Sequence, residues 1–421
     1  MKHTCTAAGI DFGTSNSSVS FISKGKAVQM VPLEDGKNTL PTTLFFEQES
    51  KNILFGTAAL EAFCDRTDGR LMRSIKRLLG SPLMAHTTLV NGRLMKFDRI
   101  IGFFLKHLKD KLEHHIQADI SGVSIGRPVF FRDNNPAEDA LAQTQLHQIA
   151  QSVGFKNISF QFEPIAAAFA HEQDIIGENL ACVIDIGGGT SDFTLIKIGA
   201  KLKNKLDRSD DILANTGVRV GGNDFDKMLS LHSFMPALGK GTRYGDKDLP
   251  VPNTVYADLS EWSHINFAYT GKTLAMVRDV LMSAHDPHLY RRLEELIVQE
   301  RGHALLNTVE ESKIELTQRG EIKKSLSFLS DKPDIHLTET QFNNDIASIV
   351  HKIRTALINC LKTANIDNED VDLVILTGGS TQVPLVKQIV SDIFPQARLS
   401  EKNKFCSVGE GLAYDSQRKH L

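Results

Sequence analysis

Two short segments of the chain share one pattern: an apolar β-forming run ends at an aspartate, glycine and hydroxyl residues follow, and a second apolar run returns. Residues 9–22 read GIDFGTSNSSVSFI, and residues 183–196 read VIDIGGGTSDFTLI. Each segment predicts a β-hairpin whose tight turn uses glycine to reach positive φ angles. Since strands and helices alternate after each copy, the repeat predicts two related α/β lobes that face a cleft.

The second turn contains three consecutive glycines, which is more than a tight turn requires. Gly187, Gly188 and Gly189 remove side chains from the loop, so its N–H groups can approach another molecule closely. Consecutive N–H groups form a concave site that suits an anion such as phosphate. Hydroxyl groups add donors to both loops: Thr14, Ser15, Ser17, Thr190 and Ser191. A plain hairpin turn is the alternative for either copy alone, but it explains two such copies poorly.

An aspartate precedes each loop, and another follows the second loop. Asp11 and Asp185 end the leading strands, and Asp192 begins the returning one. A carboxylate beside a phosphate repels it unless a cation lies between them. Mg²⁺ keeps much of its water shell and binds one or two carboxylates together with phosphate oxygens. We therefore expect a hydrated Mg²⁺ whose waters are held by these three aspartates, although each aspartate taken alone is better explained as a turn-capping residue.

Composition and charge argue against several other classes of protein. The net charge is −3 and no basic run exceeds a solvated helix face, so we expect no nucleic-acid partner. Five scattered cysteines without a CxxC pair predict reduced thiols. The apolar runs are too short to cross a membrane, and residues 1–12 lack the apolar core of a signal peptide. We expect a cytoplasmic protein without membrane contact.

Periodicity and capping signals predict several individual elements. Helices are expected over 99–118, from Pro136, over roughly 288–318 and over 338–364, and VSIGRPVFF at 123–131 is expected to form a strand. Two capping boxes are expected, with Thr338 before the fourth helix and Ser407 before a last short one. Residues 230–300 show the least periodicity, so they are expected to be mixed and variable.

Seven motifs occur in the order seen in DnaK-type heat-shock chaperones, which this chain resembles over nearly its whole length. They are GIDFGTSNS, IKRLLG (75–80), FEPIAAAFA (162–170), DIGGGTSD (185–192), GGNDFD (221–226), VEESKIEL (309–316) and LTGGSTQVP (376–384). The segments IGRPVFF, FQFEPIAAAF and RVGGNDFD resemble the short YegD-type branch still more closely. The resemblance implies the actin-like ATPase fold, an α/β architecture with two related lobes around a cleft for ATP or ADP and Mg²⁺. The divisions that we expect are 1–180 for the first lobe, 181–371 for the second, and 372–421 for strand-helix elements that complete the cleft.

The resemblance also assigns roles to individual residues. The implied first phosphate loop contains Asp11, Gly13, Thr14 and Ser15, and the second contains Asp185, Gly187, Gly188, Gly189 and Thr190. Gly221 and Gly222 would also line the nucleotide, with Gly378, Gly379, Ser380 and Gln382 under the adenosine and with Glu310 and Lys313 facing the ribose and base. Asp185 and Thr190 are implied in catalysis as well.

Two further residues carry the implied chemistry. Lys76 matches the catalytic lysine, which offsets charge as it develops near the γ-phosphate and helps to orient the attacking water. Glu163 is implied in the shell of metal-bound water. Without the motif, Lys76 would be interpreted with Arg73 and Arg77 as the solvated face of a basic helix. Glu163 would be an acid in the first turn of a helix, where the dipole favours it.

The chain departs from the chaperones at the base site. Two arginines that sandwich adenine there align with Ile314 and Gln382, and an acidic position near the C-terminal motif aligns with Gly409. A guanidinium stacked on a base contributes roughly 0.5–2 kcal/mol, so the loss of both would weaken binding about tenfold to several hundredfold unless something replaces them. Ile314 can still cover one face of a base through apolar contact.

The C-terminal region predicts a second departure. The last motif helix, SVGEGLAY, is expected to end at Tyr414, and seven residues follow. The chaperones need a hydrophobic linker and a peptide-binding β domain beyond this point. We therefore expect a protein that neither holds nor refolds peptides.

Three functions remain open. The first is an ATPase whose lobe closure couples nucleotide state to an unidentified protein partner, with slow turnover because no strong base or second charge donor is evident. The second is a small-molecule kinase with Asp133 or Glu163 as base, and no sugar-kinase signature supports it. The third is a non-catalytic nucleotide-dependent scaffold or an actin-like filament protein, suggested by Ile314 and Gln382. We favour the ATPase.

Overall fold

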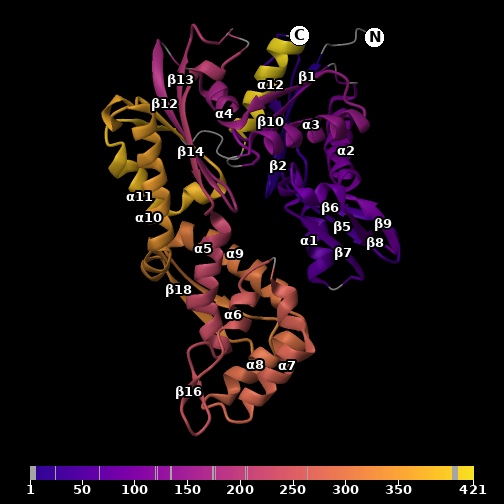
Figure 1. Cartoon of the computed structure of the whole chain (residues 1–421), viewed down its shortest axis with the longest axis vertical. Helices are drawn as coiled ribbons and strands as arrows, with labels where there is room; N and C mark the ends of the chain where they lie inside the picture. Colours follow the sequence, from indigo (N-terminus) through magenta and orange to yellow (C-terminus); the bar gives the residue numbers. More distant parts are fainter. Residues whose placement is uncertain are drawn as a thin grey trace.

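Two mixed β-sheets form the frame of the molecule (Figure 1). The computed structural model describes the chain except for residues 1–5, 24, 66, 119, 121, 133–134, 173–174, 176, 204, 206, 263 and 401–405. The first sheet has the order β11 (Ile158–Phe162), β10 (Gly122–Arg127), β1 (Thr6–Phe12), β2 (Asn16–Ser23) and β3 (Gln29–Met30), with β4 (Thr39–Pro41) also on β2. The second has the order β20 (Arg398–Ser400), β19 (Leu373–Thr377), β12 (Glu178–Ile186), β13 (Ser191–Gly199) and β14 (Ile212–Val218).

The two sheets share strand order and strand direction. In the first, β1 and β2 form an antiparallel hairpin, and β10 and β11 follow in parallel on the other side of β1. In the second, β12 and β13 form the hairpin, and β19 and β20 follow in parallel on the other side of β12. This equivalence agrees with the duplication that the two hairpin sequences predict, and each sheet with its covering helices is called a lobe below.

Two helices, α4 (Glu163–Glu172) and α12 (Ser407–His420), pack between the sheets. They share an apolar cluster with strands of the second sheet, while α12 also lies along β1 and β10 (Figure 1). The contact is close enough to require small residues: a methyl group on Gly411 would lie 1.6 Å from the Ala166 carbonyl oxygen. Thus residues 372–421 divide between the lobes, with β19 and β20 in the second sheet and α12 on the first. The domain boundaries themselves remain our proposal.

Helices α2 (Phe97–Ile116) and α3 (Pro136–Ser152) cover the first sheet and bury its apolar core. Both agree with the predicted helices, and the Asn135 side chain caps α3 by accepting from the Glu138 N–H. The predicted strand over 123–131 is too long, because β10 ends at Arg127. Pro128 follows, and a proline has no N–H with which to continue a ladder.

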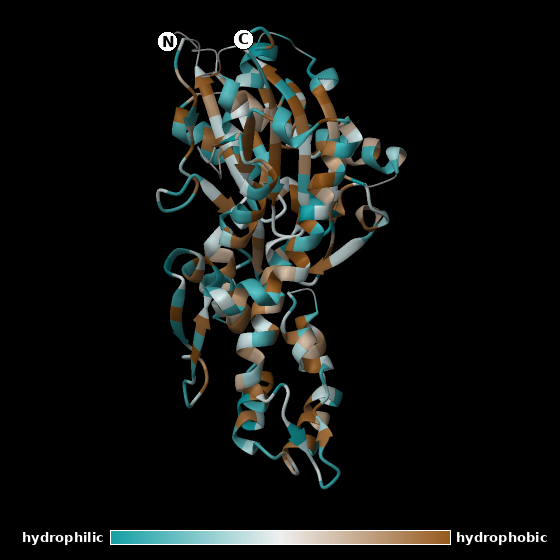
Figure 2. Cartoon of the chain, turned by 90° about the vertical axis from the view of Figure 1, so that its left-hand side faces the viewer, coloured by the Kyte–Doolittle hydropathy of each residue, from teal (hydrophilic) through white to brown (hydrophobic). Residues whose placement is uncertain are grey.

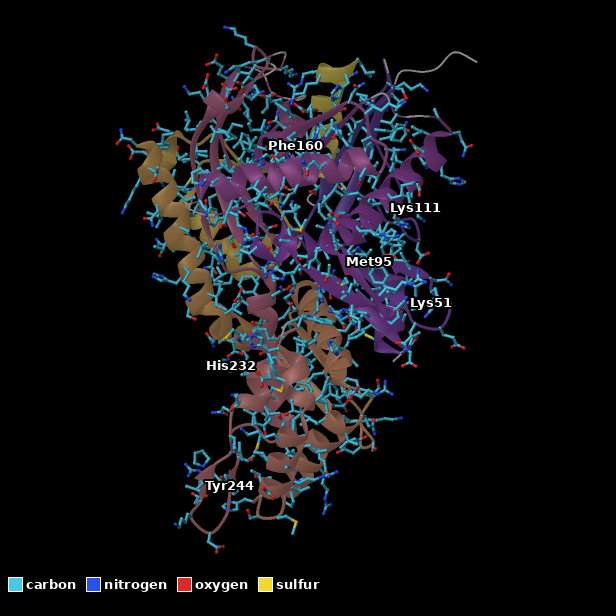
Figure 3. The ribbon with its side chains drawn as sticks, turned by 45° about the vertical axis from the view of Figure 1, so that its right-hand side comes forward. Lys51, Met95, Lys111, Phe160, His232 and Tyr244 are labelled. Carbon is cyan, nitrogen blue, oxygen red and sulfur yellow. The ribbon has the colours of Figure 1, made fainter. Side chains whose placement is uncertain are left out.

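Each lobe has an outer part beyond its sheet. That of the first lobe contains α1 (Gly56–Cys64), β5 (Thr43–Glu47), β6 (Ile53–Phe55), β7 (Gly69–Arg73), β8 (Thr87–Val90) and β9 (Arg93–Lys96). That of the second contains α5 (Gly222–Leu229), β15 (Arg243–Tyr244), β16 (Leu249–Pro250), α6 (Thr254–Leu259), α7 (Gly271–Leu281), α8 (Pro287–Val298), α9 (Gly302–Arg319), β17 (Glu321–Ser325) and β18 (Asp334–Thr338). Figure 2 shows hydrophobic residues concentrated in the strands of the two sheets, and Figure 3 places Met95 and Tyr244 in the two outer parts.

Several predicted helices need correction in the second lobe. The single helix expected over 288–318 is two, α8 and α9, separated where Glu300 adopts a left-handed conformation with φ of 50°. The segment 230–300 is mainly helical. Helix α10 (Glu339–Ala364) begins as predicted, with the Thr338 hydroxyl accepting from the Gln341 N–H, and packs near α11 (Pro384–Ile393).

The last helix is longer than predicted and starts differently. Ser407 is its first residue, not its cap, and the Ser407 hydroxyl has no hydrogen-bond partner within the described residues. The helix continues through Tyr414 to His420. No helix in the described part of the chain has the length and apolar character needed to cross a bilayer.

Candidate functional site

The two hairpin tips contain the predicted loops, but their glycines serve a different purpose from the one expected. The prediction that they supply positive φ angles is wrong, because Gly13, Gly187, Gly188 and Gly189 all lie outside that region. Lack of space restricts Gly13 and Gly188 instead, whereas a methyl group on Gly187 would make only an ordinary contact at 3.7 Å. A methyl group on Gly13 would lie 2.0 Å from the Asn16 carbonyl oxygen, and one on Gly188 would lie 2.4 Å from Ser15 Oγ. The Ser15 contact joins the first loop to the second.

The N–H groups of both loops are available to a ligand. Within the described residues, Thr14, Ser15, Gly188 and Gly189 donate no backbone hydrogen bond. The second loop is held in shape from below: Gly187 donates to the Thr190 carbonyl at 2.9 Å, and the first residues of α5 donate to the carbonyls of Gly187 and Gly188. Such a row of unpaired N–H groups suits an anion.

Charged side chains gather between the loops. Lys76, on a short 3₁₀ turn (Ile75–Leu78), donates to Glu163 Oε1 at 2.7 Å, and its side chain is only 7% exposed. The alternative in which Lys76 lies on a solvated helix face is therefore wrong. Glu163 begins α4, so the pair joins the outer part of the first lobe to the helix between the sheets. Asp185 pairs in register with Asp192 across the second hairpin.

The carboxylates disfavour their charged forms. Desolvation, followed by repulsion from Glu163, raises the pKa of Asp11 to about 7, although Lys76 opposes the shift. Desolvation also raises the pKa of Asp185 well above its usual range, with further contributions from Glu163, Asp192 and Asp11. Glu163 and the aspartates thus repel one another, and Lys76 offsets only part of that repulsion. This excess of negative charge is the environment that a bound cation neutralises.

The donor set fits a cation held through water. Among the described residues, no group of three His, Cys, Asp or Glu side chains is arranged to hold a metal ion directly. A cavity of about 20 Å³ lies beside Glu163, Asp185 and Asp192, and that volume accommodates one water molecule. Hydrated Mg²⁺ retains such waters, so the residues present are compatible with the predicted mode of binding.

The remaining predicted nucleotide residues meet behind the second loop. Gly378 has φ of 82°, and a methyl group there would lie 2.3 Å from the Ile186 carbonyl oxygen and 2.8 Å from Asp185 Oδ1. Ser380, just after Gly379, donates to the Gly187 carbonyl at 3.3 Å. The next contacts come from α5 and α9. Gly221 caps α5 and lies against Gly187, and Ser380 Oγ would be 2.5 Å from a methyl group on Gly222.

Lys313 lies at the same place, where it pairs with a buried carboxylate. Its ammonium group donates to Asp226 Oδ2 at 2.9 Å and lies near the Gly222 carbonyl. Desolvation raises the pKa of Asp226 to about 6, and Lys313 limits the rise. The role of Lys313 at the ribose and base remains a prediction, and the sequence motif did not indicate Asp226 as its partner.

The outer parts of the lobes touch at the mouth of the cleft. Arg73 Nη2 lies 3.6 Å from Glu310 Oε2, and the Arg73 guanidinium lies 4.3 Å from the centre of the Trp262 ring. Nearby, the Phe63 ring packs edge-on against His303 at 4.3 Å. Burial and then Arg73 lower the pKa of His303 to about 4. Glu310, predicted to face the ribose, is thus also part of a cross-cleft contact that no motif indicated.

The departures from the chaperone pattern have distinct surroundings. Ile314 is 52% exposed on α9, whereas Gln382 is half-buried on the turn after Gly379. Gly409 packs on the first hairpin, where a methyl group would lie 2.6 Å from Ser18 Oγ, so an acidic side chain has no room there. Asp133, the alternative kinase base, lies outside the described residues.

A larger cavity lies away from the loops. It measures about 680 Å³ along the edge of β11, where Figure 3 labels Phe160. Its cations are already engaged: Arg127 pairs with Asp139, and Lys419 pairs with Asp415. Lys419 also donates to the Phe160 carbonyl at 3.1 Å, which blocks the open strand edge. The cleft between the hairpins is therefore the candidate site.

Duplicated lobes around paired loops define the actin-like ATPase class of fold. The chain belongs to the Hsp70 family, since the family model described as Hsp70 protein matches residues 7–242 and 296–415. It is 26% identical over 414 residues to the chaperone protein DnaK of Thermosipho melanesiensis, covering 96% of this chain and 57% of that protein. It is also 26% identical to the mitochondrial heat shock 70 kDa protein of Pisum sativum and 25% identical to the chaperone protein HscA of Salmonella paratyphi B.

For the last two relatives, too, the alignment covers most of this chain but a smaller share of the relative. The alignments cover 96% and 97% of this chain, but only 54% and 58% of those relatives. The chain thus spans little more than half the length of the curated relatives that it matches. The internal segment that the family model leaves unmatched, residues 243–295, forms part of the outer helical region of the second lobe.

Proposed function

We propose that this chain binds ATP or ADP with Mg²⁺ between its hairpin loops and slowly hydrolyses ATP. The observation that carries the proposal is the buried pair of Lys76 and Glu163, which meets Asp11 and Asp185 beside loops with available N–H groups. N–H groups in a row suit phosphate. A lysine in a desolvated site suits the charge that develops during phosphoryl transfer. Membership of the Hsp70 family supports the same activity.

Each group has a distinct role in this proposal. The N–H groups of Thr14, Ser15, Gly188 and Gly189 bind phosphate oxygens. Lys76 offsets charge at the phosphate that is transferred, and Glu163 holds the ammonium group in place. Asp11, Asp185 and Asp192 accept hydrogen bonds from the waters of the ion. Mg²⁺ supplies, when bound, the positive charge that lets carboxylates and phosphate share the site.

We propose further that nucleotide state is coupled to a protein partner through closure of the lobes. The contacts at the cleft mouth, Arg73 with Glu310 and Phe63 with His303, join the outer parts of the two lobes. Opening the cleft must break them, so a nucleotide that favours closure changes the relative position of the lobes. A partner that binds one arrangement better would respond to that change. We expect the protein to act in the cytoplasm.

The first test is the production of ADP from Mg-ATP by the purified protein, with no acceptor added, beside Asp185→Asn. We expect slow hydrolysis in the wild type and about a hundredfold less in the variant, because the carboxylate that orients metal-bound water is lost. Tight ATP binding without turnover would favour the scaffold. ADP release only with an added metabolite would favour the kinase.

Lys76→Ala separates chemistry from binding. Because the lysine acts mainly on charge that develops during the reaction, we expect turnover to fall more than ATP affinity. Arg93→Ala is the matched control, since this exposed cation of β9 lies on the same lobe. Equal turnover in Lys76→Ala and wild type would remove the assignment of this residue.

A further inference from the structure

Three cations lie between the last residue of β7 and the 3₁₀ turn, and one of them has no side-chain partner among the residues that the structure describes. Arg73 contacts Glu310 and Trp262, and Lys76 binds Glu163. The side chain of Arg77, by contrast, makes no ion pair or hydrogen bond with any residue that the structure describes. Its charge is therefore available to an anion from outside the chain.

The Arg77 guanidinium nevertheless has a defined position, on the second phosphate loop. A methyl group on Gly189 would lie 2.0 Å from Arg77 Nη2 and 3.1 Å from its Cζ. The N–H of Gly189 is itself available to a ligand. A residue of the first lobe thus places its N–H donors beside the available N–H donors of the second lobe. Two sets of donors directed at one place form a site for a group rich in acceptor oxygens.

Hydrogen bonds hold the backbone of Arg77 in place. Ser74 precedes the turn in a left-handed conformation with φ of 56°, and the Arg77 N–H donates to the Ser74 carbonyl at 3.1 Å. The Arg77 carbonyl accepts from Arg132 Nη2 at 3.2 Å. Consecutive residues of a 3₁₀ turn point in directions about 120° apart. This explains why Lys76 is buried toward Glu163 while its neighbour reaches across the cleft.

We propose that Arg77 binds the terminal phosphate of ATP from across the cleft, and that this contact distinguishes ATP from ADP. The inference rests on the proposed function, in which adjacent Lys76 acts at the phosphate that is transferred. Two consecutive residues bring their head groups to the same end of the polyphosphate. A guanidinium offers paired donors that match phosphate oxygens, and among the described residues no carboxylate pairs with Arg77. Arg77 is then the second charge donor that the sequence did not reveal.

The test is a calorimetric titration of the full chain with Mg²⁺ and either ADP or the non-hydrolysable imido analogue of ATP. Arg77→Ala should weaken binding of the analogue about tenfold, the typical effect of losing a hydrogen bond to a charged group, and change ADP binding less than twofold. Arg77→Lys should fall between, because it retains the charge but not the paired donors. Arg93→Ala, the exposed control on the same lobe, should match the wild type.

The outcomes separate this inference from the proposed function. If the wild type binds both nucleotides and Arg77→Ala weakens both equally or neither, the inference is wrong and the proposed function stands. If the wild type binds neither nucleotide, both fail together. Thermal unfolding of each variant without ligand checks the fold. Since the Arg77 side chain is exposed and pairs with none of the described residues, we expect no loss of stability.

Discussion

The two phosphate loops have the same backbone plan but different neighbours. In both, a leading strand ends at an aspartate and a returning strand pairs with it in antiparallel register. The glycine of the first loop, Gly13, is crowded by the backbone of its own turn. In the second loop, Gly188 and Gly189 are crowded by side chains from the other lobe, namely Ser15 and Arg77.

This difference indicates a division of labour within the duplicated fold. The first lobe sends the side chains of Ser15 and Arg77 toward the second loop, whereas the second lobe presents bare backbone to them. The glycines of the second loop leave room for the first lobe, since Gly188 lies against Ser15 and Gly189 lies against Arg77. Variants that act on one loop only can test whether the asymmetry is real.

The largest effect is expected from removing the aspartate charges. Asp11→Asn and Asp185→Asn should each reduce ATP hydrolysis about a hundredfold while making the ligand-free protein more stable. The gain should be larger for Asp185→Asn, because Asp192 lies opposite Asp185 whereas Ser18 lies opposite Asp11. Urea unfolding in the presence of a chelator measures this. Equal stabilisation by both variants would contradict the asymmetry.

The pH dependence of stability follows from the same charges. Asp11 has a pKa of about 7 in the folded protein instead of 3.8, so the folded state holds its proton more tightly than the unfolded state. Ligand-free protein should therefore lose stability as pH rises from about 4 to about 7 and keep that deficit above 7. The full difference corresponds to about 4 kcal/mol, and we expect about half because the carboxylate is only half-buried.

Asp11→Asn should reduce this loss of stability, which unfolding curves at pH 4 and pH 8 can measure. The variant and the wild type should differ little at pH 4 and by about 2 kcal/mol at pH 8. A Glu49→Gln variant controls for the loss of one exposed acidic charge. An identical pH profile for Asp11→Asn and wild type would show that Asp11 is ionised at its ordinary pKa.

Alanine substitutions at one glycine of each loop should affect the stability of the protein differently. Gly13→Ala meets fixed backbone at 2.0 Å, so it should lower the free energy of unfolding by about 1–3 kcal/mol. Gly189→Ala meets only the far end of the flexible Arg77 side chain, so stability should change by less than about 0.5 kcal/mol. Urea unfolding of both variants is the measurement, and a larger loss for Gly189→Ala would reverse the proposed roles.

The sequence was informative wherever a motif and a local periodicity coincided. The apolar spacing of 99–118 and the capping signals at Asn135 and Thr338 involve neighbouring residues, so the helices that they indicate agree with the structure. Repetition of the hairpins predicted the equal topology of the sheets, because the same local pattern produces the same pairing. The predicted strand at 123–131 failed at Pro128, a local signal that was available but not applied.

Contacts between distant segments were not predictable in this way. Trp262 and His303 carry no motif, and the motif IKRLLG assigned no role to Arg77; their importance comes from the other lobe that lies opposite them. Sequence periodicity even suggested a solvated face for the segment that contains Lys76. Likewise, Asp226 became visible as the partner of Lys313 only when α5 and α9 were placed together. These contacts depend on how distant segments pack together in the fold, and local sequence propensity does not reveal them.

The smallest expected effect concerns the site of the nucleotide base. A substitution there tests whether the difference between the two lobes extends from the phosphate loops to the base. Ile314 is 52% exposed on α9, so Ile314→Arg can place a guanidinium there without disturbing the core. If the base lies beside Ile314, as the resemblance to the chaperones implies, a cation–π contact of about 1 kcal/mol should tighten ATP binding roughly fivefold.

Inorganic triphosphate distinguishes stacking from simple charge attraction in this experiment. It has no base, so its affinity should be unchanged in Ile314→Arg if the new guanidinium stacks on adenine. Val298→Arg, at a similarly exposed apolar position of α8, controls for the added charge. Tighter binding of both ligands would attribute the gain to long-range attraction, which salt weakens. Tighter binding of ATP alone would place the base on the α9 side of the cleft, with the second lobe supplying its site.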